Sequence, residues 1–305
     1  MVVCLVFIQS CKNTRSNQPT SSVYIKVLGI AQDAGYPQIN CREACCIKVY
    51  QGKETKKLVS SLGVINLEDR KKYIFDATPD FNLQSQLLNE DLEDIKIIDG
   101  IFLTHAHMGH YTGLMQLGFE SMNSDKIPVY AMPRMKNYLK ANGPWSQLVK
   151  FNNIELQELK SDSTVLLSKK LKVTPFLVPH RDEFSETVGY KIEGPQKSAL
   201  FIPDINKWQL WSKSIVGKIK TVDYAFLDAT FFKSGEINRP MAEVPHPFIE
   251  ETVDLFKNET AETKQKVIFI HFNHTNPAIL NQHFLKDSIQ NLGFRFAKNG
   301  QIYDL

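Results

Sequence analysis

The chain has 305 residues, of which 43% are hydrophobic and 23% are charged, with 15 glycines and 14 prolines. This composition can bury a core, and it excludes a disordered or collagen-like chain. Lysine and arginine number 36 against 33 acidic residues, so the formal net charge is +3, far from the clustered basicity of a nucleic-acid-binding protein. Length alone allows one large domain or two small ones.

The first 22 residues differ in character from the rest of the chain. An apolar run, Val2–Ile8, leads to Cys11, and a polar stretch follows through Ser22. Residues 8–11 resemble the lipidation box of a bacterial lipoprotein, in which Cys11 carries the lipid and Cys4 belongs to the signal. The run is short and no basic region precedes it, which a start codon further upstream would explain. We expect a lipid anchor in the cell envelope; the alternative is an apolar tail on a cytoplasmic protein.

From residue 23 onward, short β-rich runs mix with longer stretches of helical apolar spacing. The predicted strands, in chain order, are Val23–Ile30, Leu58–Leu67, Lys72–Asp76, Gly100–Leu103, Val129–Ala131, Leu171–Pro175, Thr187–Ile192, Ala199–Ile202, Tyr224–Leu227 and Val267–His271. The predicted helices are Phe81–Leu88, Tyr111–Phe119, Arg134–Lys140, Phe248–Phe256 and Pro277–Leu292. No linker rich in glycine, serine or proline interrupts them, so we expect one layered α/β domain over residues 23–305.

Three histidines follow the predicted strand 100–103 almost at once. His105 and His107 point to the same side of an extended backbone, because side chains alternate along a strand, and His110 rejoins them where the chain turns into a helix. Converging neutral imidazoles suit zinc or iron. Surface histidines or a hydrogen-bonded cluster are the alternative, but they do not account for three histidines within six residues after an apolar strand.

This segment resembles the His-x-His-x-Asp-His signature of the metallo-β-lactamase superfamily, with Gly109 in place of the aspartate. The family's later ligands are matched in order, each after a predicted strand, by His180, Asp204 and His271. Taken alone, His180 would also suit a loop cap and Asp204 a turn. Asp76 matches an early strand-end aspartate that supports the family's site without binding metal.

The resemblance implies a four-layer αβ/βα sandwich with a metal centre at the strand ends. The implied metal ligands are His105, His107 and His180 for the first ion, and His110, His271 and Asp204 for the second, with Asp204 bridging the two. Because Gly109 lacks the family's carboxylate, we expect a weakened second site, a single-metal enzyme as an alternative, and a gain of the second metal on Gly109→Asp substitution. Zinc lowers the pKa of a bound water to about 7, so that metal-bound hydroxide can attack phosphorus or a carbonyl carbon.

A cysteine cluster after the first strand resembles one branch of the superfamily, which contains the pyrroloquinoline quinone biosynthesis protein B family and the cyclic phosphodiesterases of phosphonate breakdown. Residues 76–84, 227–232 and 273–277 resemble segments of the quinone-biosynthesis family. The resemblance implies a structural zinc on Cys41, Cys45, Cys46 and His274. Neighbouring cysteines rarely both reach one ion comfortably, so a three-ligand site, a degraded site or plain buried thiols stay open.

Two further residues are candidates for catalysis beside Asp204. His246 lies in a proline-flanked loop and would serve as general acid for the leaving group, or as an N-terminal residue of the helix near Phe248. Asp228 either contacts the site or merely ends its strand. We expect Tyr111 to lie in the core or behind the site, and His283 to lie at the surface of a helix.

The sequence therefore predicts a zinc-dependent hydrolase of a phosphodiester or related ester, with a small-molecule substrate. Two alternatives are an iron-dependent oxidation, as in a quinone-biosynthesis step, and a non-catalytic metal-binding lipoprotein. No nucleic-acid partner is expected, and membrane contact is expected only through the lipid anchor.

Overall fold

The structure is a computed structural model that describes residues 19–305, except 94–95, 239 and 241–242. Cys4 and Cys11 lie outside the described residues, and so does the predicted lipid anchor. Within the described part of the chain, no helix is long and apolar enough to cross a membrane.

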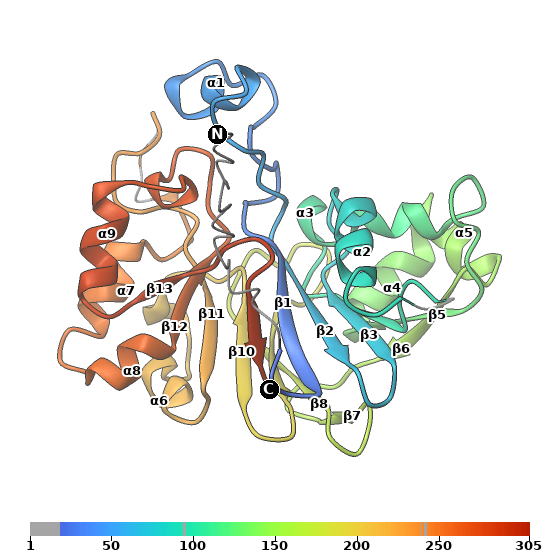
Figure 1. The fold of residues 1–305 in the computed structure, drawn as a ribbon. Coiled ribbons are helices and arrows are strands. Elements are labelled where there is room, and N and C mark those ends of the chain that lie inside the picture. The colour runs from blue at the N-terminus through green and yellow to red at the C-terminus, as the bar shows by residue number, and fades with distance from the viewer. Residues whose placement is uncertain (1–18, 94–95, 239, 241–242) are drawn as a thin grey trace, which may run out of the picture.

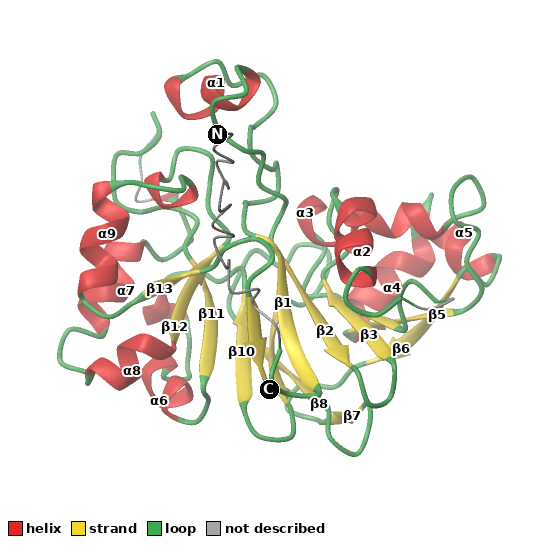
Figure 2. Cartoon of the chain, viewed as in Figure 1, coloured by secondary structure: helices red, strands yellow, loops and turns green. Residues whose placement is uncertain are grey.

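Two seven-stranded sheets face each other, and helices cover their outer faces (Figures 1 and 2). The first sheet has the order β14 (Ile302–Asp304), β1 (Val23–Gly29), β2 (Ser61–Asn66), β3 (Lys71–Phe75), β4 (Gly100–Phe102), β5 (Ile127–Ala131) and β6 (Ile154–Glu158). The second has the order β13 (Arg295–Phe296), β12 (Val267–Ile270), β11 (Tyr224–Asp228), β10 (Ser198–Ile202), β9 (Val188–Glu193), β8 (Lys172–Leu177) and β7 (Val165–Leu166). The predicted single-domain αβ/βα sandwich is confirmed.

The helices form the two outer layers of the sandwich. Beside the first sheet lie α2 (Phe81–Asn89), α3 (Met108–Tyr111), α4 (Pro133–Ala141) and α5 (Trp145–Lys150), and beside the second lie α6 (Ile215–Lys220), α7 (Ile249–Leu255), α8 (Ala261–Lys266) and α9 (Phe284–Asn291). Short 3-10 turns lie at η1 (Thr112–Leu117), η2 (Trp208–Leu210) and η4 (Pro277–Ile279). Helix α1 (Ala44–Tyr50) lies at one end of the molecule, above the sheets in Figure 1.

Strand β1 shows how the sequence builds the layers. Val23, Ile25 and Val27 enter the core between the sheets, while Tyr24 and Leu28 enter the core beneath the outer helices. Side chains alternate along a strand, so a strand that is covered on both faces is apolar almost throughout.

The strands that carry the candidate site end at one edge of the sandwich. Strands β3 and β4 are parallel, as are β10, β11 and β12, and β8 runs with β10 because both are antiparallel to β9. Asp76 and His271 follow β3 and β12 with φ of 68° for both, a left-handed conformation that non-glycine residues adopt rarely. Such conformations gather at functional sites.

All ten predicted strands have counterparts, and the sequence missed the edge strands β6, β7, β13 and β14. The predicted helix 277–292 is instead η4 and α9, because Leu280 and His283 both adopt extended backbone and interrupt the helical turns. His283 is therefore not inside a helix: it is the N-cap of α9, where its ring accepts a hydrogen bond from the Leu285 N–H at 3.2 Å. Tyr111 is buried, as expected, and its hydroxyl contacts that of Tyr138 at 2.9 Å.

Candidate metal centre

The first group of candidate ligands is His105, His107, His180 and Asp204, whose ligand atoms all lie within 4.8 Å of one another. His105 Nε2 lies 2.9 Å from His107 Nδ1 and 3.3 Å from Asp204 Oδ2. His180 Nε2 lies 3.9 Å from Asp204 Oδ1. The loops after β4, β8 and β10 bring these side chains together, as the sequence predicts.

The second group is Asp33, His110, Asp204 and His271, again with all ligand atoms within 4.8 Å of one another. Asp204 Oδ2 lies 3.0 Å from His110 Nε2 and 3.6 Å from His271 Nε2. Asp204 thus joins the two groups, as predicted. Asp33 is not among the ligands predicted from the sequence, although it follows β1 at the edge where the other ligands follow their strands.

Buried hydrogen bonds fix the orientation of the two histidine rings, His105 and His110, that follow β4. His110 Nδ1 lies 2.7 Å from Asp76 Oδ2, and His105 Nδ1 lies 2.9 Å from the hydroxyl of Thr104. The Thr104 hydroxyl in turn donates to Asp76 at 2.9 Å. Both histidines therefore carry a proton on Nδ1 and direct Nε2 into the site, the arrangement in which partners behind the ligands orient metal-binding histidines.

A second chain of hydrogen bonds holds His271. The Nδ1–H donates to the Thr230 hydroxyl at 3.0 Å, and that hydroxyl donates to Asp228 Oδ1 at 2.7 Å. His271 Nε2 therefore also faces the site with its lone pair when the ring is neutral.

Several buried polar atoms of the site have no hydrogen-bond partner in the part of the chain that the structure describes, and they are spaced as metal ligands are. His110 Nε2, His180 Nε2 and Asp204 Oδ1 are buried without a hydrogen-bond partner among the described residues, and such atoms cost about 1–3 kcal/mol each when left unsatisfied. Zinc bonds of about 2.0–2.1 Å in tetrahedral geometry separate ligand atoms by about 3.3 Å. The Asp204 Oδ2 distances of 3.3, 3.0 and 3.6 Å match that spacing, so the groupings support a metal cofactor.

The charge states of the first group also suit a cation. Burial holds the pKa of His105 well below its usual value and lowers the pKa of His180 to about 4, so both rings are neutral at pH 7. Burial alone would raise the pKa of Asp204, but the neighbouring histidines outweigh it and hold that pKa well below the usual value. Neutral imidazoles and a carboxylate are the forms that bind metal.

Asp228 and His246 form a pair beside the metal groups. His246 Nδ1 donates to Asp228 Oδ2 at 2.8 Å and lies 3.2 Å from Asp204 Oδ1. Burial would lower the pKa of His246, but the charges of Asp228 and Asp204 raise it to about 10. His246 precedes α7, whose N-cap is Phe248, so the alternative helix-terminal role does not apply.

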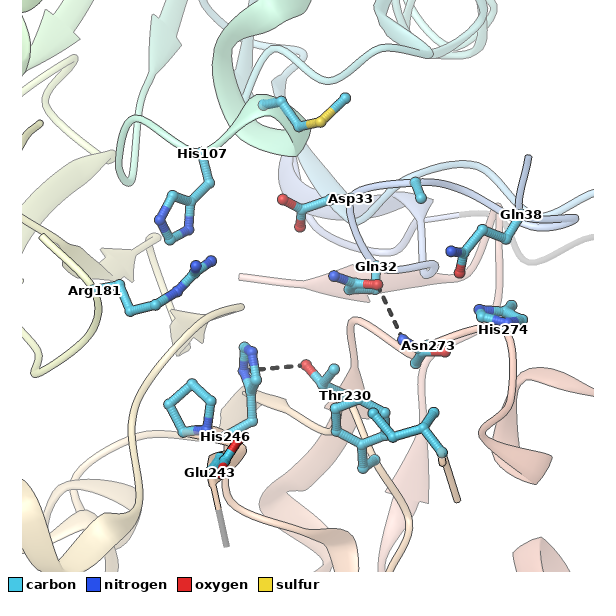
Figure 3. Close-up of a pocket in the computed structure, with 15 residues that line it drawn as sticks. Gln32, Asp33, Gln38, His107, Arg181, Thr230, Glu243, His246, Asn273 and His274 are labelled. Atoms are coloured by element: carbon cyan, nitrogen blue, oxygen red, sulfur yellow. Dashed lines mark hydrogen bonds between the residues drawn. The ribbon is translucent and has the colours of Figure 1, made fainter. Parts of the chain in front are cut away.

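A pocket of about 620 Å³ opens beside both metal groups (Figure 3). Its lining includes Asp33, His107, His246 and His274, together with Arg181, whose guanidinium points into the space between His107 and His246. Arg181 is not among the residues predicted from the sequence, although it directly follows the candidate ligand His180.

The cysteine cluster converges as predicted. The ligand atoms of Cys41, Cys45, Cys46 and His274 lie within 4.8 Å of one another, and the two sulfurs of Cys41 and Cys45 are 3.7 Å apart. Zinc–sulfur bonds of about 2.3 Å in a tetrahedron place sulfurs about 3.8 Å apart. The neighbouring cysteines therefore both reach the cluster, and zinc binding there remains a prediction.

The second group contains two carboxylates even though position 109 is glycine. A Cβ atom at Gly109 would lie 2.6 Å from Asp33 Cα and 2.6 Å from Asp33 Cγ. Asp33 occupies the space beside this glycine and contributes its carboxylate to the group. The weakened second site and the metal gain in Gly109→Asp stay predictions, but a side chain at position 109 would collide with Asp33, whose carboxylate already lies in the group.

Comparison with known proteins places this geometry in a family. The profile of the "Beta-lactamase superfamily domain" matches residues 71–272. "Coenzyme PQQ synthesis protein B" of Acinetobacter baylyi is 22% identical over 310 residues, which cover 92% of this chain and 99% of that protein. The protein of the same name from Gluconobacter oxydans is 23% identical, covering 92% of this chain and 97% of its own.

Two solved structures show the same fold. Zn²⁺-bound PqqB from Methylobacterium extorquens has a TM-score of 0.77 at 21% identity, with 92% of this chain and 100% of that chain covered. A structure described as a new diphosphatase from the PhnP family has a TM-score of 0.64 at 22% identity, with 93% and 98% covered.

Proposed function

The chain belongs to the beta-lactamase superfamily, and from that premise we propose that it is a metal-dependent hydrolase that cleaves a phosphodiester or related ester of a small molecule. One observation carries the proposal: two groups of histidine and carboxylate ligands share Asp204 at the edge of a pocket. Zinc is the proposed metal. The Zn²⁺ bound by one structural relative supports this metal, and the diphosphatase name of another supports a phosphate ester as the substrate.

The metal centre, when occupied, supplies a water of lowered pKa and positive charge beside the ester. The protein's own part is to hold that chemistry in place. The hydrogen bonds behind His105, His110 and His271 fix each ring before the substrate arrives. Asp204 joins the two groups, because its Oδ2 faces His105 of the first group as well as His110 and His271 of the second.

His246 is the proposed general acid for the leaving oxygen. Asp228 fixes its Nδ1, and the ring lines the pocket with the remaining nitrogen available to a substrate. Asp228 is itself held by the backbone N–H groups of Ile205 at 3.0 Å and Thr230 at 2.9 Å. Asp228 is thus a positioning residue and His246 a catalytic one.

The pocket favours a small anionic ester. Its volume of about 620 Å³ is typical of small-molecule sites. Arg181 places a permanent positive charge at the mouth of the metal centre, in reach of a substrate's phosphate oxygens (Figure 3). The amide side chains of Gln32, Gln38 and Asn273 line the same pocket and offer hydrogen bonds to the rest of the substrate.

The cysteine cluster is proposed as a separate structural zinc site. Cys41 and the start of α1 would be joined through the ion to His274, three residues beyond the candidate ligand His271. Such a site closes a loop rather than opening a coordination position to substrate.

The cell-envelope location remains a proposal that rests on the sequence around Cys11. A Cys11→Ser variant, expressed in a bacterium from the full chain, is expected to move from the membrane fraction to the aqueous fraction. The lipid anchor would be contradicted if the protein without this substitution were already found in the aqueous fraction.

The proposed hydrolase is tested by metal analysis of the purified protein together with hydrolysis of bis(p-nitrophenyl) phosphate. We expect bound zinc and turnover, and loss of both turnover and metal from the first group in His107→Ala. His283→Ala serves as the control, because that ring caps α9 outside the metal groups. Iron with redox activity would support the oxidation alternative, and metal without either activity would support a binding protein.

A further inference from the structure

The loop after β1 places Asp33 beside His271 through backbone pairing. Phe272 N–H donates to the Ile30 carbonyl, and Gln32 N–H donates to the Phe272 carbonyl, each at 2.8 Å. Ala31 and Phe272 form a parallel bridge. Asp33 therefore follows a segment that is fixed to the residue after His271.

One carboxylate oxygen of Asp33 faces both histidines of the second group. Asp33 Oδ1 lies 3.3 Å from His110 Nε2 and 3.2 Å from His271 Nε2. These are the ligand spacings of about 3.3 Å expected around a tetrahedral zinc. The Asp33 side chain is only 18% exposed.

The two carboxylates of this group call for positive charge beside them. Each histidine gives its Nδ1–H to a partner behind it, so a neutral ring presents a lone pair to the Asp33 oxygen. Asp204 adds a second carboxylate to the same space, 3.0 Å from His110 Nε2. Two carboxylates and two buried imidazole rings in one space need positive charge between them. A proton on His110 can supply it, because the charges of Asp76 and Asp33 outweigh burial and raise the pKa of that ring well above its usual value, and so can a metal ion held at the spacings above.

Gly109 explains why this carboxylate reaches the site from a distant part of the chain. Its backbone belongs to helix α3 and is not among the positive-φ glycines, so conformation does not require glycine there. Instead, Asp33 Cα would lie 2.6 Å from a Cβ at this position, which no side chain tolerates. The absence of a side chain at 109 is what admits the Asp33 backbone.

We propose that Asp33 is the terminal carboxylate ligand of the second metal, supplied by the loop after β1 and admitted by the glycine at position 109. The inference rests on the proposed metal-dependent hydrolase, because it assigns a ligand within the same centre. It makes the second group a site of four protein ligands, namely Asp33, His110, Asp204 and His271.

The test counts zinc in the purified full-length protein by mass spectrometry, and follows zinc uptake by titration calorimetry after chelation. Asp33→Asn keeps the size of the side chain and removes its charge. We expect it to hold one zinc fewer than the unaltered protein, with the first group and the cysteine cluster still occupied. Asp182→Asn is the matched control, because Asp182 is exposed and pairs with Arg134 at the surface, 3.5 Å away.

Each outcome separates the two proposals. An unchanged zinc count in Asp33→Asn overturns the inference and leaves the hydrolase standing. An unaltered protein that binds no metal outside the cysteine cluster overturns the proposed function itself. Should the variant fail to fold, zinc-edge anomalous diffraction from crystals of the unaltered protein decides: an Asp33 oxygen at about 2.0–2.2 Å from the second ion upholds the inference, and any longer distance overturns it.

Discussion

The substitution Gly109→Ala tests whether the close approach of Asp33 shapes the metal centre. The added methyl group would lie 2.6 Å from Asp33 Cα, and a contact below 3.0 Å forces the backbone to shift. Overpacking of this kind costs about 1–3 kcal/mol. The loop after β1 is also paired with Phe272, so we expect the shift to displace the Asp33 carboxylate from His110 and His271.

The assay for Gly109→Ala combines urea denaturation with zinc counting. The matched control is Gly217→Ala, which places the same methyl group in helix α6 with Ser214 atoms at an ordinary 3.5 Å. In a helix this exchange stabilises by about 0.5–1 kcal/mol. We therefore expect opposite signs for the two variants, with loss of zinc only in Gly109→Ala. Equal stability and an unchanged zinc count in Gly109→Ala would refute the steric argument.

Three further predictions follow from separate parts of the structure. Asp228→Asn should lower kcat on bis(p-nitrophenyl) phosphate by about 10²-fold with little change in KM, because His246 loses the negative charge that raises its pKa; full activity would contradict the positioning role of Asp228. Cys46→Ser should cost one zinc equivalent and lower the melting temperature, whereas an unchanged zinc count would leave the cluster as plain thiols. Burial raises the pKa of Glu236 from 4.5 to about 7, so between those pH values the folded protein holds a proton that the unfolded chain has lost. Stability should therefore fall as pH rises through this window, and Glu236→Gln should flatten the slope in urea titrations at pH 4.5 and 7; an identical slope in the variant would contradict the raised pKa.

The strand-end histidines illustrate what the sequence could predict. Apolar runs of four to eight residues mark buried strands, and polar residues directly after such runs must meet at one edge when the strands are parallel. His105, His180, Asp204 and His271 all follow that rule, and the structure brings all four together. The edge strand β6 was missed for the opposite reason, because three of its five residues are polar and only Ile154 is fully buried.

Asp33 shows where prediction from the sequence stopped. It follows β1 as the other ligands follow their strands, so its position was visible, but a family signature drew attention to position 109 instead. The loop that contains Asp33 fills the space beside Gly109, although it lies some 75 residues earlier in the chain. Its position depends on the pairing of Ala31 with Phe272, two residues that are far apart in the sequence. Local patterns do not encode such distant packing, whereas the unexplained glycine was a signal that another group approaches closely.

The central claim is that hydrolysis depends on metal held by the groups that share Asp204. The most direct measurement is the rate of phosphodiester hydrolysis by one preparation before chelation, after removal of metal with a chelator, and after addition of zinc. We predict that the rate falls to the uncatalysed level on removal and returns as zinc is restored, and that Asp204→Asn does not recover in the same titration. A rate that survives removal of the metal, or an Asp204→Asn variant that recovers with zinc as the unaltered protein does, would contradict the account.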